Sequence, residues 1–357
     1  MYCLKNIEYA RMPNDIIKLY CDLYQFVGRN KTMLDTVDKD FDTLVAQTVR
    51  LDTYFFVSMF GTPLSESRFR QLLTKDIQGK TKAERFVNNV KGAMTKIHNE
   101  TETFELFTTE IYDLLKYLYK GVEADSQLQF AKTERRKNKT TDLLSSTHPT
   151  KREALEELVT AFKRLRHKSD YEDAFLIVNF YVDFINLRPF VTHNDAIGLM
   201  LLYILYITSG FESLHLSSLF ELLHKQQDNL TRHTKDASHN WGEGLANVMS
   251  LHRFMIERLL ESYQSLHELL RNYTYDQQTN KSDYVENTIN KLDEVFTKEQ
   301  IREAHPTISD STINRTLKRL RDEKKIRPLG KGRSAKWMKL YKTEKKQSLY
   351  EQIKFKV

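Results

Sequence analysis

Two long hydrophobic stretches near the middle of the chain are separated by a short polar segment. Residues 173–187 are apolar on nearly every side and too many for an ordinary strand, which predicts a helix buried all round. Pro189 is expected to end that helix, because proline disfavours a helical conformation in the residue before it. Residues 197–207 predict a second buried helix, since this run is well short of the roughly 20 residues that span a bilayer. The pattern therefore predicts a helix–loop–helix hairpin in the core.

Apolar residues recur at helical spacing through most of the remaining chain, which indicates a mainly α protein. Glycine and proline, at 11 and 6 of 357 residues, are scarce enough to leave long helices uninterrupted. Further helices are predicted over residues 33–60, 64–73, 81–97, 108–119, 151–165 and 244–272, after a helical extension within residues 1–30. Residues 122–147 are polar and charged and are expected to form a long loop.

The C-terminal part of the chain has a different pattern. Residues 274–281 are polar and are predicted to be a linker. One helix is predicted over 284–292, a second is predicted to start at a capping box formed by Thr297–Gln300, and a third is predicted over 308–320. Two short strand-like segments then flank a glycine-containing turn within residues 326–341. Three helices followed by a basic hairpin resemble a winged helix-turn-helix, a small α+β domain placed here at residues 281–343. Its apolar set would be Ile289, Leu292, Ile301, Ile313, Leu317, Leu320, Ile326 and Trp337.

Charge is distributed unevenly along the chain. Residues 281–357 hold 20 Lys and Arg against 11 Asp and Glu, whereas the whole chain has a net charge of +7. The basic excess therefore belongs to the C-terminal part, including a basic tail at 344–357, and the preceding residues are slightly acidic. Such a distribution is typical of a module that binds a polyanion.

The resemblance to a winged helix implies candidate DNA-binding residues. Its third helix would enter the major groove, and the hairpin would contact phosphates. The helix would offer Ser311, Thr312, Asn314, Arg315, Lys318 and Arg319, and the hairpin Lys331 and Arg333. Twelve of the fifteen charged residues between 308 and 342 are basic, which favours double-stranded DNA as a partner. The alternative is a protein-interaction winged helix whose basic face is only solvated.

The polar loop between the two central helices reads Arg188-Pro-Phe-Val-Thr-His-Asn-Asp195. It resembles the signature of the Fic family, His-Pro-Phe-x-Asp/Glu-Gly-Asn-Gly-Arg-x-x-Arg, and retains Pro189, Phe190 and Asn194. The resemblance implies an all-α Fido fold over residues 50–273, preceded by an N-terminal helical extension at 1–49. It also implies a target-binding flap within 122–147, frequent dimerisation, and AMP transfer from ATP to protein hydroxyls.

Catalytic positions of the signature are changed in this chain. Arg188 stands where the family has its catalytic histidine, and Thr192 stands where it has the metal-binding acid. An arginine is permanently protonated at neutral pH and cannot accept a proton from an attacking hydroxyl. General-base catalysis in the manner of the family is therefore not expected, and neither a metal nor a cofactor is expected.

The anion-binding positions of the signature are changed as well. His193 and Asp195 replace the two glycines that let backbone amides face the phosphates, and Ala196 and Leu199 replace the two arginines. Asp195 is expected at the N-cap of the second helix, where its carboxylate would bind the free amides and repel a phosphate. The family's inhibitory glutamate is also missing, because the corresponding positions are Phe56, Phe60 and Gly61.

Two charged residues of the loop have alternative interpretations. His193 could be a relocated base, since histidine titrates in the right range, but no acid is evident to orient it, and we favour a polar residue without chemistry. Arg188 could bind an anion or form a structural ion pair with Asp195, and we favour the ion pair.

The remaining candidate ligands point to neither zinc nor disulfides. Five histidines are expected at the surface: His215, His224, His233, His239 and His252. They include no pair four residues apart and no neighbouring cysteines. Cys3 and Cys21 suggest no disulfide framework, and the first residues lack the apolar core of a signal peptide, so a cytoplasmic protein of bacterial type is expected. Core packing is predicted for Tyr181, Phe184 and Phe190.

The sequence favours a DNA-binding regulator or defence-related factor built on a Fic-fold domain that has lost the residues for AMP transfer. Its expected partner is double-stranded DNA, a second copy of the chain is a further option, and no membrane is expected. One alternative is a noncanonical nucleotide-dependent transferase that acts through residues 188–194. Another is a protein-interaction scaffold that binds a partner in the flap groove.

Overall fold

The computed structural model describes residues 3–75, 77–100, 104–132, 150–278, 281–306, 308–330 and 335–340, and the side chains of 275–278 are outside the description. The chain divides into two compact units. The larger comprises Met1–Asp35 with Val45–Glu268, and the smaller comprises Thr36–Leu44 with Leu269–Val357.

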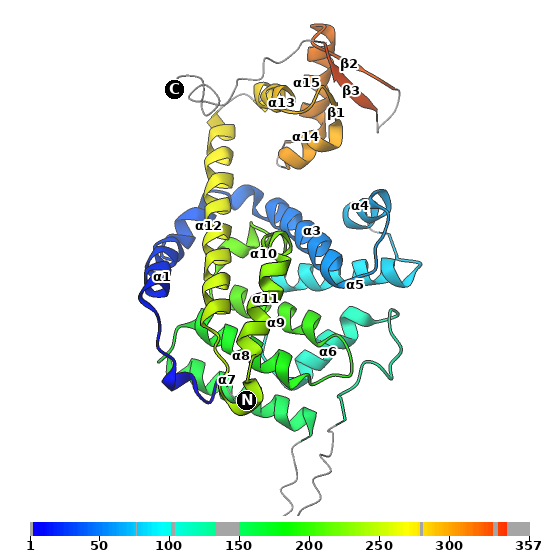
Figure 1. Ribbon diagram of the computed structural model, residues 1–357. Helices are drawn as coiled ribbons and strands as arrows, with labels where there is room; N and C mark the ends of the chain where they lie inside the picture. The colour runs from blue at the N-terminus through cyan, green and yellow to red at the C-terminus, as the bar shows by residue number, and fades with distance from the viewer. Residues whose placement is uncertain are drawn as a thin grey trace, which may run out of the picture. The chain divides into compact units, whose positions relative to one another are not determined.

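The regular secondary structure of the larger unit is helical in its described part, apart from one isolated β-bridge (Figure 1). Its helices are α1 (Asn14–Val27), α2 (Asn30–Asp35), α4 (Glu66–Thr74), α5 (Lys82–Asn99), α6 (Thr108–Tyr119), α7 (Lys151–Lys168), α8 (Asp173–Leu187), α9 (Asn194–Thr208), α10 (Leu219–Lys225) and α11 (Gln227–Ser238). Short 3-10 turns of this unit are η1 (Ile7–Tyr9), η4 (Glu212–His215) and η5 (Trp241–Glu243), whereas η2 (Asp38–Asp40) belongs to the smaller unit. Two helices, α3 (Phe41–Phe60) and α12 (Met249–Gln278), have residues in both units.

The predicted hairpin of two buried helices is confirmed. Helices α8 and α9 pack against each other, and nearly every residue of both is buried. Gly198 permits the close approach, because a Cβ atom there would lie 3.0 Å from Ile185 and 3.1 Å from Phe184. The predicted core residues Tyr181, Phe184 and Phe190 are all buried. This hairpin places the polar loop at one end of the core.

Three predicted boundaries are wrong. The single helix expected over 33–60 is divided into α2, η2 and α3, at a segment where Asp38 and Asp40 favour turns and caps over a helix interior. Helix α12 starts at Met249 instead of 244, because Gly244 ends the preceding turn with a left-handed φ of 74°, which a right-handed helix does not contain. The linker expected at 274–281 is helical as far as Gln278, since it contains no glycine or proline to stop α12.

Besides η2 and its parts of α3 and α12, the smaller unit combines three complete helices with a small antiparallel sheet. These elements are α13 (Lys281–Lys291), β1 (Val295–Thr297), α14 (Lys298–Ala304), α15 (Asp310–Asp322), β2 (Ile326–Pro328) and β3 (Lys336–Lys339). The strand order is β1-β3-β2, with Phe296 opposite Trp337 and Arg327 opposite Met338. Strand β1 was not predicted from the sequence. The predicted capping box between Thr297 and Gln300 is present.

A separate hydrophobic core holds the smaller unit together. It contains most of the predicted apolar set, and Leu292 and Trp337 pack against it while staying partly exposed. Val285, Phe296 and Ile308 also belong to it and were not predicted. The predicted stripe on α15 is confirmed, because Ile313, Leu317 and Leu320 are all buried.

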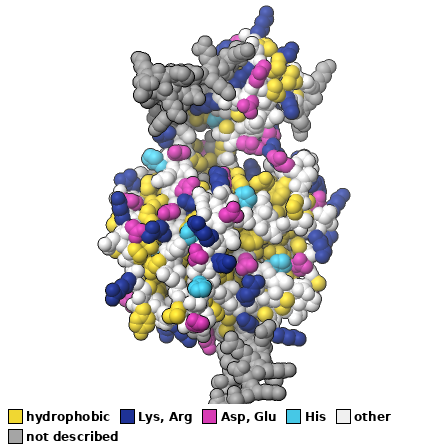
Figure 2. All heavy atoms as spheres, viewed as in Figure 1, with side chains coloured by type: hydrophobic (Ala, Val, Ile, Leu, Met, Phe, Trp, Pro, Cys, Tyr) yellow, Lys and Arg dark blue, Asp and Glu magenta, His cyan; other side chains and the backbone are white. Residues whose placement is uncertain are grey.

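The surface of the larger unit mixes charges of both signs. On the face drawn in Figure 2, Lys and Arg side chains alternate with Asp and Glu over the helices of this unit. This arrangement agrees with the small net charge of residues 1–280. Among the described residues, no helix combines the length and hydrophobicity needed to cross a bilayer.

Candidate functional site

Asn194 fixes the shape of the loop between α8 and α9. Its Oδ1 accepts a hydrogen bond from the backbone N of Phe190 at 2.9 Å, and its Nδ2 donates to the carbonyl O of Phe190 at 2.8 Å. Both residues are buried. Because the side chain satisfies two backbone groups of the loop, Asn194 acts on the conformation of this loop.

A segment from the predicted flap pairs with this loop. Phe130 and Phe190 form an antiparallel bridge, in which the N–H of Ala131 donates to the O of Pro189 at 2.9 Å. The N–H of Val191 donates to the O of Gln129 at 3.0 Å, and the hydroxyl of Thr192 donates to the O of Gln127 at 3.0 Å. The described residues of the flap thus occupy one edge of the loop, whereas residues 133–149 lie outside the description.

Aromatic side chains support the same pairing. The ring of Tyr112 on α6 stacks on Phe130 with centroids 5.0 Å apart, and Phe130 lies 5.2 Å from Phe190. Phe190 also contacts Phe184 of α8 at 6.3 Å. These rings join α6, the flap segment and the loop into one packed cluster.

His193 has a left-handed backbone and a packed ring. Its φ of 62° is the conformation that a glycine adopts most easily, and the family signature has a glycine at this position. The imidazole stacks on Tyr119 with centroids 3.6 Å apart, and its Nε2 lies 3.8 Å from the carboxylate of Glu123. Partial burial lowers the pKa of His193 from its ordinary value, which favours the neutral ring. The expectation that no acid lies near His193 is therefore wrong. Glu123 was not identified from the sequence because it is far from His193 along the chain.

The ion pair expected between Arg188 and Asp195 is present but long. Their nearest atoms are 3.8 Å apart, and both side chains are mostly exposed. Asp195 is not the N-cap as predicted: the N–H of Ile197 bonds to the O of His193, so His193 is the cap and Asp195 lies in the first turn. An exposed pair of this kind contributes little stability.

The positions of the two signature arginines lie in the protein core. Ala196 and Leu199, which replace them, are 2% and 1% exposed. With both arginines replaced, Arg188 is the one residue of the loop 188–195 whose side chain has a permanent positive charge. In the part of the chain that the structure describes, no group of three or more His, Cys, Asp or Glu could hold a metal ion.

Two of the five histidines expected at the surface are buried. His215 and His98, which the sequence did not single out, share a hydrogen bond of 2.9 Å between their Nδ1 atoms. His98 Nε2 lies 2.9 Å from the Tyr203 hydroxyl, which donates to Asp52 at 2.8 Å. Burial lowers the pKa of His98 to about 3 and of His215 to about 4 and raises that of Asp52 to about 7. This network lies inside the core and stabilises the packing of α3, α5 and α9.

The second buried histidine is His252 on α12. Its Nε2 lies 2.7 Å from the hydroxyl oxygen of Tyr20, and that hydroxyl donates its hydrogen to Glu172 at 2.5 Å. Burial lowers the pKa of His252 to about 3. Both misplaced histidines lie beside leucines in the sequence, Leu214, Leu216 and Leu251, and this apolar context was a signal for burial.

Asp183 is a second buried carboxylate that the sequence analysis missed. It lies within α8 and accepts hydrogen bonds from the backbone N of Cys3, the backbone N of Leu4, and Trp241 Nε1, at 3.0, 3.0 and 2.7 Å. It is the only charged residue in 174–187, which was the available signal. Its role is to hold the N-terminal segment and Trp241 against the central helix.

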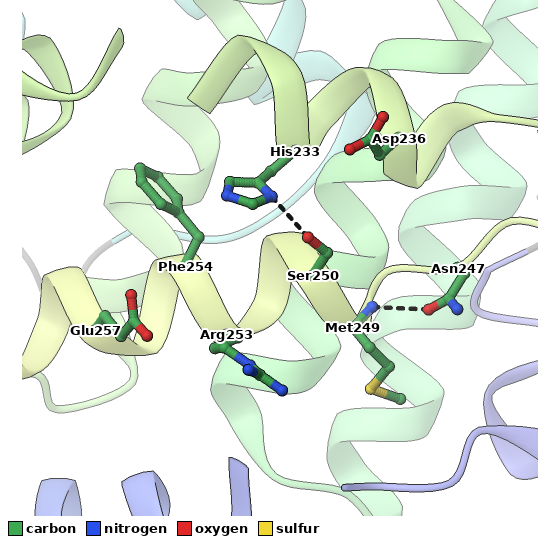
Figure 3. Close-up of a pocket in the computed structure, with 8 residues that line it drawn as sticks. All are labelled: His233, Asp236, Asn247, Met249, Ser250, Arg253, Phe254 and Glu257. Carbon is green, nitrogen blue, oxygen red and sulfur yellow. Dashed lines mark hydrogen bonds between the residues drawn. The ribbon is translucent and has the colours of Figure 1, made fainter. Parts of the chain in front are cut away.

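A polar pocket of about 690 Å³ lies between α11 and α12 (Figure 3). Ser250 and His233 share a hydrogen bond of 2.6 Å across it, and the His233 ring lies 5.3 Å from Phe254. Asp236 and Glu257 also line the pocket, yet neither hydrogen-bonds to His233 among the described contacts. The Ser250–His233 pair therefore joins two helices without the acid that orients the base of a catalytic triad.

The predicted DNA-binding residues divide into two groups. Ser311, Asn314, Arg315 and Lys318 are exposed on one face of α15, and Arg315 and Lys318 form no ion pair with any described residue. Asn314 accepts a hydrogen bond from Lys298, and Ser311 shares one with Ser309. The half-buried Thr312 is part of the helix cap formed by Ser309.

Arg319 belongs to the second group, because it is held by carboxylates. Its guanidinium pairs with Glu286 at 2.7 Å and Glu323 at 3.3 Å, which joins α15 to α13. The side chain is therefore engaged within the unit. Lys331 and Arg333 of the predicted hairpin lie outside the described residues.

Comparisons with known proteins identify the fold. No protein-family model matches the sequence, and no curated protein matches it. A Fic family protein from Desulfovibrio desulfuricans aligns with a TM-score of 0.53 at 11% identity, over 93% of this chain and 98% of that chain. A Fic domain containing signaling protein from Bacteroides thetaiotaomicron gives 0.51 at 12% identity, over 70% and 98%.

Fic-1 from C. elegans gives a TM-score of 0.50 at 14% identity, over 69% of this chain and 71% of that chain. At these identities the likeness concerns the fold alone. The buried α8–α9 hairpin, with its loop at one end of the core, is thus part of an architecture found in bacterial and animal Fic proteins. The chain has the Fic, or Fido, fold.

Proposed function

We propose that this protein is a DNA-binding regulator or defence-related factor, in which the smaller unit binds duplex DNA and the Fic-fold unit does not transfer AMP. The observation that carries the proposal is the exposed face of α15. Four exposed polar residues lie on it at helical spacing: Ser311, Asn314, Arg315 and Lys318. The opposite face is buried in the unit's own core.

The order of elements in the smaller unit supports this proposal. A helix, a strand, two helices and two further strands follow one another along the chain, with the last strand in the middle of the sheet. This order resembles a winged helix-turn-helix, in which the helix equivalent to α15 enters the major groove. Arginine and asparagine can read base edges there, and lysine can contact phosphates.

The geometry of the loop supports the absence of AMP transfer. Arg188 cannot act as a base, and the two arginine positions of the signature are occupied by the buried Ala196 and Leu199. The edge of the loop is hydrogen-bonded to residues 127–131 of the same chain. A nucleotide would meet neither a base at the family position nor its arginine pair.

A second candidate function is a noncanonical transferase that uses His193. The observation that favours it is Glu123, whose carboxylate lies 3.8 Å from His193 Nε2 and could orient a neutral imidazole. The ring is stacked on Tyr119, and the anion-binding arginines are missing. We therefore rank this function second.

The test of DNA binding is a gel-shift titration of the full chain with mixed-sequence duplex DNA at two salt concentrations. Replacing both Arg315 and Lys318 with alanine should weaken binding about a hundredfold at low salt, because two cationic contacts are lost. A matched control replaces Arg164 and Lys168, an exposed pair on α7 of the larger unit, and should leave the affinity unchanged.

Affinity should also fall steeply as salt rises, because lysines and arginines release counterions from the phosphates. The slope of log affinity against log salt should be smaller for the α15 double variant than for the control. Salt-independent binding, or equal losses in the two double variants, would show that α15 is not the DNA-binding element.

A further inference from the structure

A cavity of about 270 Å³ lies in the larger unit among α5, α6 and the last turn of α9. Its walls are hydrophobic and aromatic, with contributions from Phe104, Leu114, Tyr117 and Ile204. A concave, mostly apolar pocket with a few polar groups is the usual form of a small-molecule site. None of the loop residues 188–195 lines this cavity, so it is distinct from the Fic loop.

The polar groups at the cavity are predominantly acidic. Glu100, Glu110 and Asp113 contribute carboxylates, whereas Lys96 is the only basic residue among the described residues that line the cavity. Lys96 lies 3.8 Å from Glu100, so its charge is already matched. Glu110 and Asp113 form no ion pair with any cation in the described parts of the chain. The cavity therefore has an excess of negative charge.

One helix presents its negative end to the cavity. Helix α5 ends at Asn99, and Ile97 from its last turn lines the cavity. Thr208 from the last turn of α9 lines it as well, but the Thr208 carbonyl already accepts a hydrogen bond from the Arg166 guanidinium, so α9 adds no available negative end. The C-terminal end of a helix carries a partial negative charge and favours a nearby cation. This contribution comes from the backbone and is independent of the three carboxylates.

A glycine leaves the space that an aromatic side chain of the cavity wall occupies. A Cβ atom at Gly92 of α5 would lie 2.3 Å from the hydroxyl oxygen of Tyr117, so only glycine leaves room for the tyrosine in this position. The Tyr117 ring lines the cavity and is about half exposed. The face of an aromatic ring attracts a cation and also packs against methylene groups.

We infer that this cavity binds a small organic cation with an aliphatic body, of the class of short diamines. The hydrophobic walls accommodate the methylene chain, and the carboxylates with the C-terminal end of α5 stabilise the ammonium groups. An anion would be repelled by the same groups. A neutral molecule of the same length would gain only the apolar contacts.

The test is isothermal titration calorimetry on the full chain with three five-carbon probes of different charge. Cadaverine, the dication, should bind with one site per chain, whereas pentanediol should bind at least about tenfold more weakly and glutarate should not bind. Tenfold corresponds to about 1.4 kcal/mol, the size of one charge-assisted contact in a partly solvated site.

Three variants locate the site. Glu110→Gln and Asp113→Asn should each weaken cadaverine binding about tenfold, and Gly92→Ala should weaken it without changing any charge, because it displaces Tyr117. The control is Glu157→Gln, which removes another exposed carboxylate, on α7, and should bind cadaverine like the unchanged protein.

Three results would overturn the inference: no heat of binding with cadaverine at millimolar concentration, equal binding of pentanediol, or binding unaffected by both carboxylate variants. Circular dichroism of each variant separates loss of the site from loss of folding. None of these outcomes depends on DNA binding, so the test is independent of the function proposed above.

Discussion

The loop between α8 and α9 and the exposed face of α15 are both rich in polar residues, but they use them differently. In the loop, Asn194 bonds to the backbone of Phe190, His193 stacks on Tyr119, and Arg188 faces Asp195. On α15, Arg315 and Lys318 extend from an exposed face without an ion-pair partner among the described residues.

This difference separates residues that maintain a fold from residues that are available to a ligand. Polar groups already bonded within the chain must lose those bonds before they can bind anything else, which costs free energy. Solvated charges on a helix face have no such cost and can exchange water and counterions for phosphates. Changes in the loop should therefore affect stability, and changes on α15 should affect binding.

The largest effect on stability is expected for Asn194→Ala. This change removes a buried amide and leaves the N–H and C=O of Phe190 without their partners, which should lower the free energy of unfolding by about 2 to 3 kcal/mol. Denaturant unfolding followed by circular dichroism measures it, with the exposed Asn99→Ala as control. DNA affinity below the unfolding transition should not change. A stable variant with weakened DNA binding would contradict the comparison.

The next effect concerns pH and His252. Burial lowers its pKa from the ordinary value of 6.5 to about 3, so the unfolded chain takes up a proton below pH 6.5 that the folded chain does not. Stability from this group is thus present above pH 6.5 and lost as the pH falls. His252→Gln should reduce the stability lost between pH 7 and pH 5 by about 2 kcal/mol.

The contribution of Asp52 to stability depends on pH in the opposite direction. Burial raises the pKa of Asp52 to about 7, so its contribution to the free energy of unfolding declines as the pH rises from about 4 to 7. The comparison of His252→Gln with the unchanged chain isolates the histidine from this effect. His239→Gln, at an exposed position, is the matched control. Identical pH profiles for both variants would show that His252 titrates normally.

A smaller effect is expected within α15 itself. Arg319→Ala should lower stability by about 1 kcal/mol, because its pairs with Glu286 and Glu323 are partly exposed. It should change DNA affinity less than about threefold, whereas Arg315→Ala should weaken DNA binding with little effect on stability. The reverse pattern would mean that the arginine bound to carboxylates is the one that contacts DNA.

The smallest effect is expected from ATP. Millimolar Mg-ATP should shift the melting temperature by less than about 1 °C, because the loop lacks the family's arginine pair and its glycines. Labelled ATP should leave no adduct on the protein, and Arg188→His should not create one, since a base alone does not bind a triphosphate. A saturable rise in melting temperature, or an adduct lost in His193→Ala, would favour the transferase function.

Periodicity was sufficient to locate the helices that determine the fold. Helix α6 and helix α8 begin and end where the hydrophobic pattern predicts, because each has a full apolar face and a clear stop signal. The break between α2 and α3 was missed, since it depends on a short run of aspartates instead of a glycine or proline. Strand β1 was missed because three residues are too few to show an alternating pattern.

The site was only partly predictable, for a related reason. Sequence alignment placed Arg188, His193 and Asn194 in one loop, but the partners of His193 come from α6 and the segment after it. Contacts between distant segments leave no local periodicity. His215 and His252 were assigned to the surface because histidine is a polar residue, although the leucines beside them indicated burial.

The pairing between residues 127–131 and the loop has a kinetic consequence. The amide hydrogens of Ala131 and Val191 are donors in this bridge, so they can exchange with deuterium only when the two segments separate. Their exchange rates therefore measure how often the loop opens and for how long. Any ligand that requires access to Pro189 and Val191 can bind no faster than this opening allows.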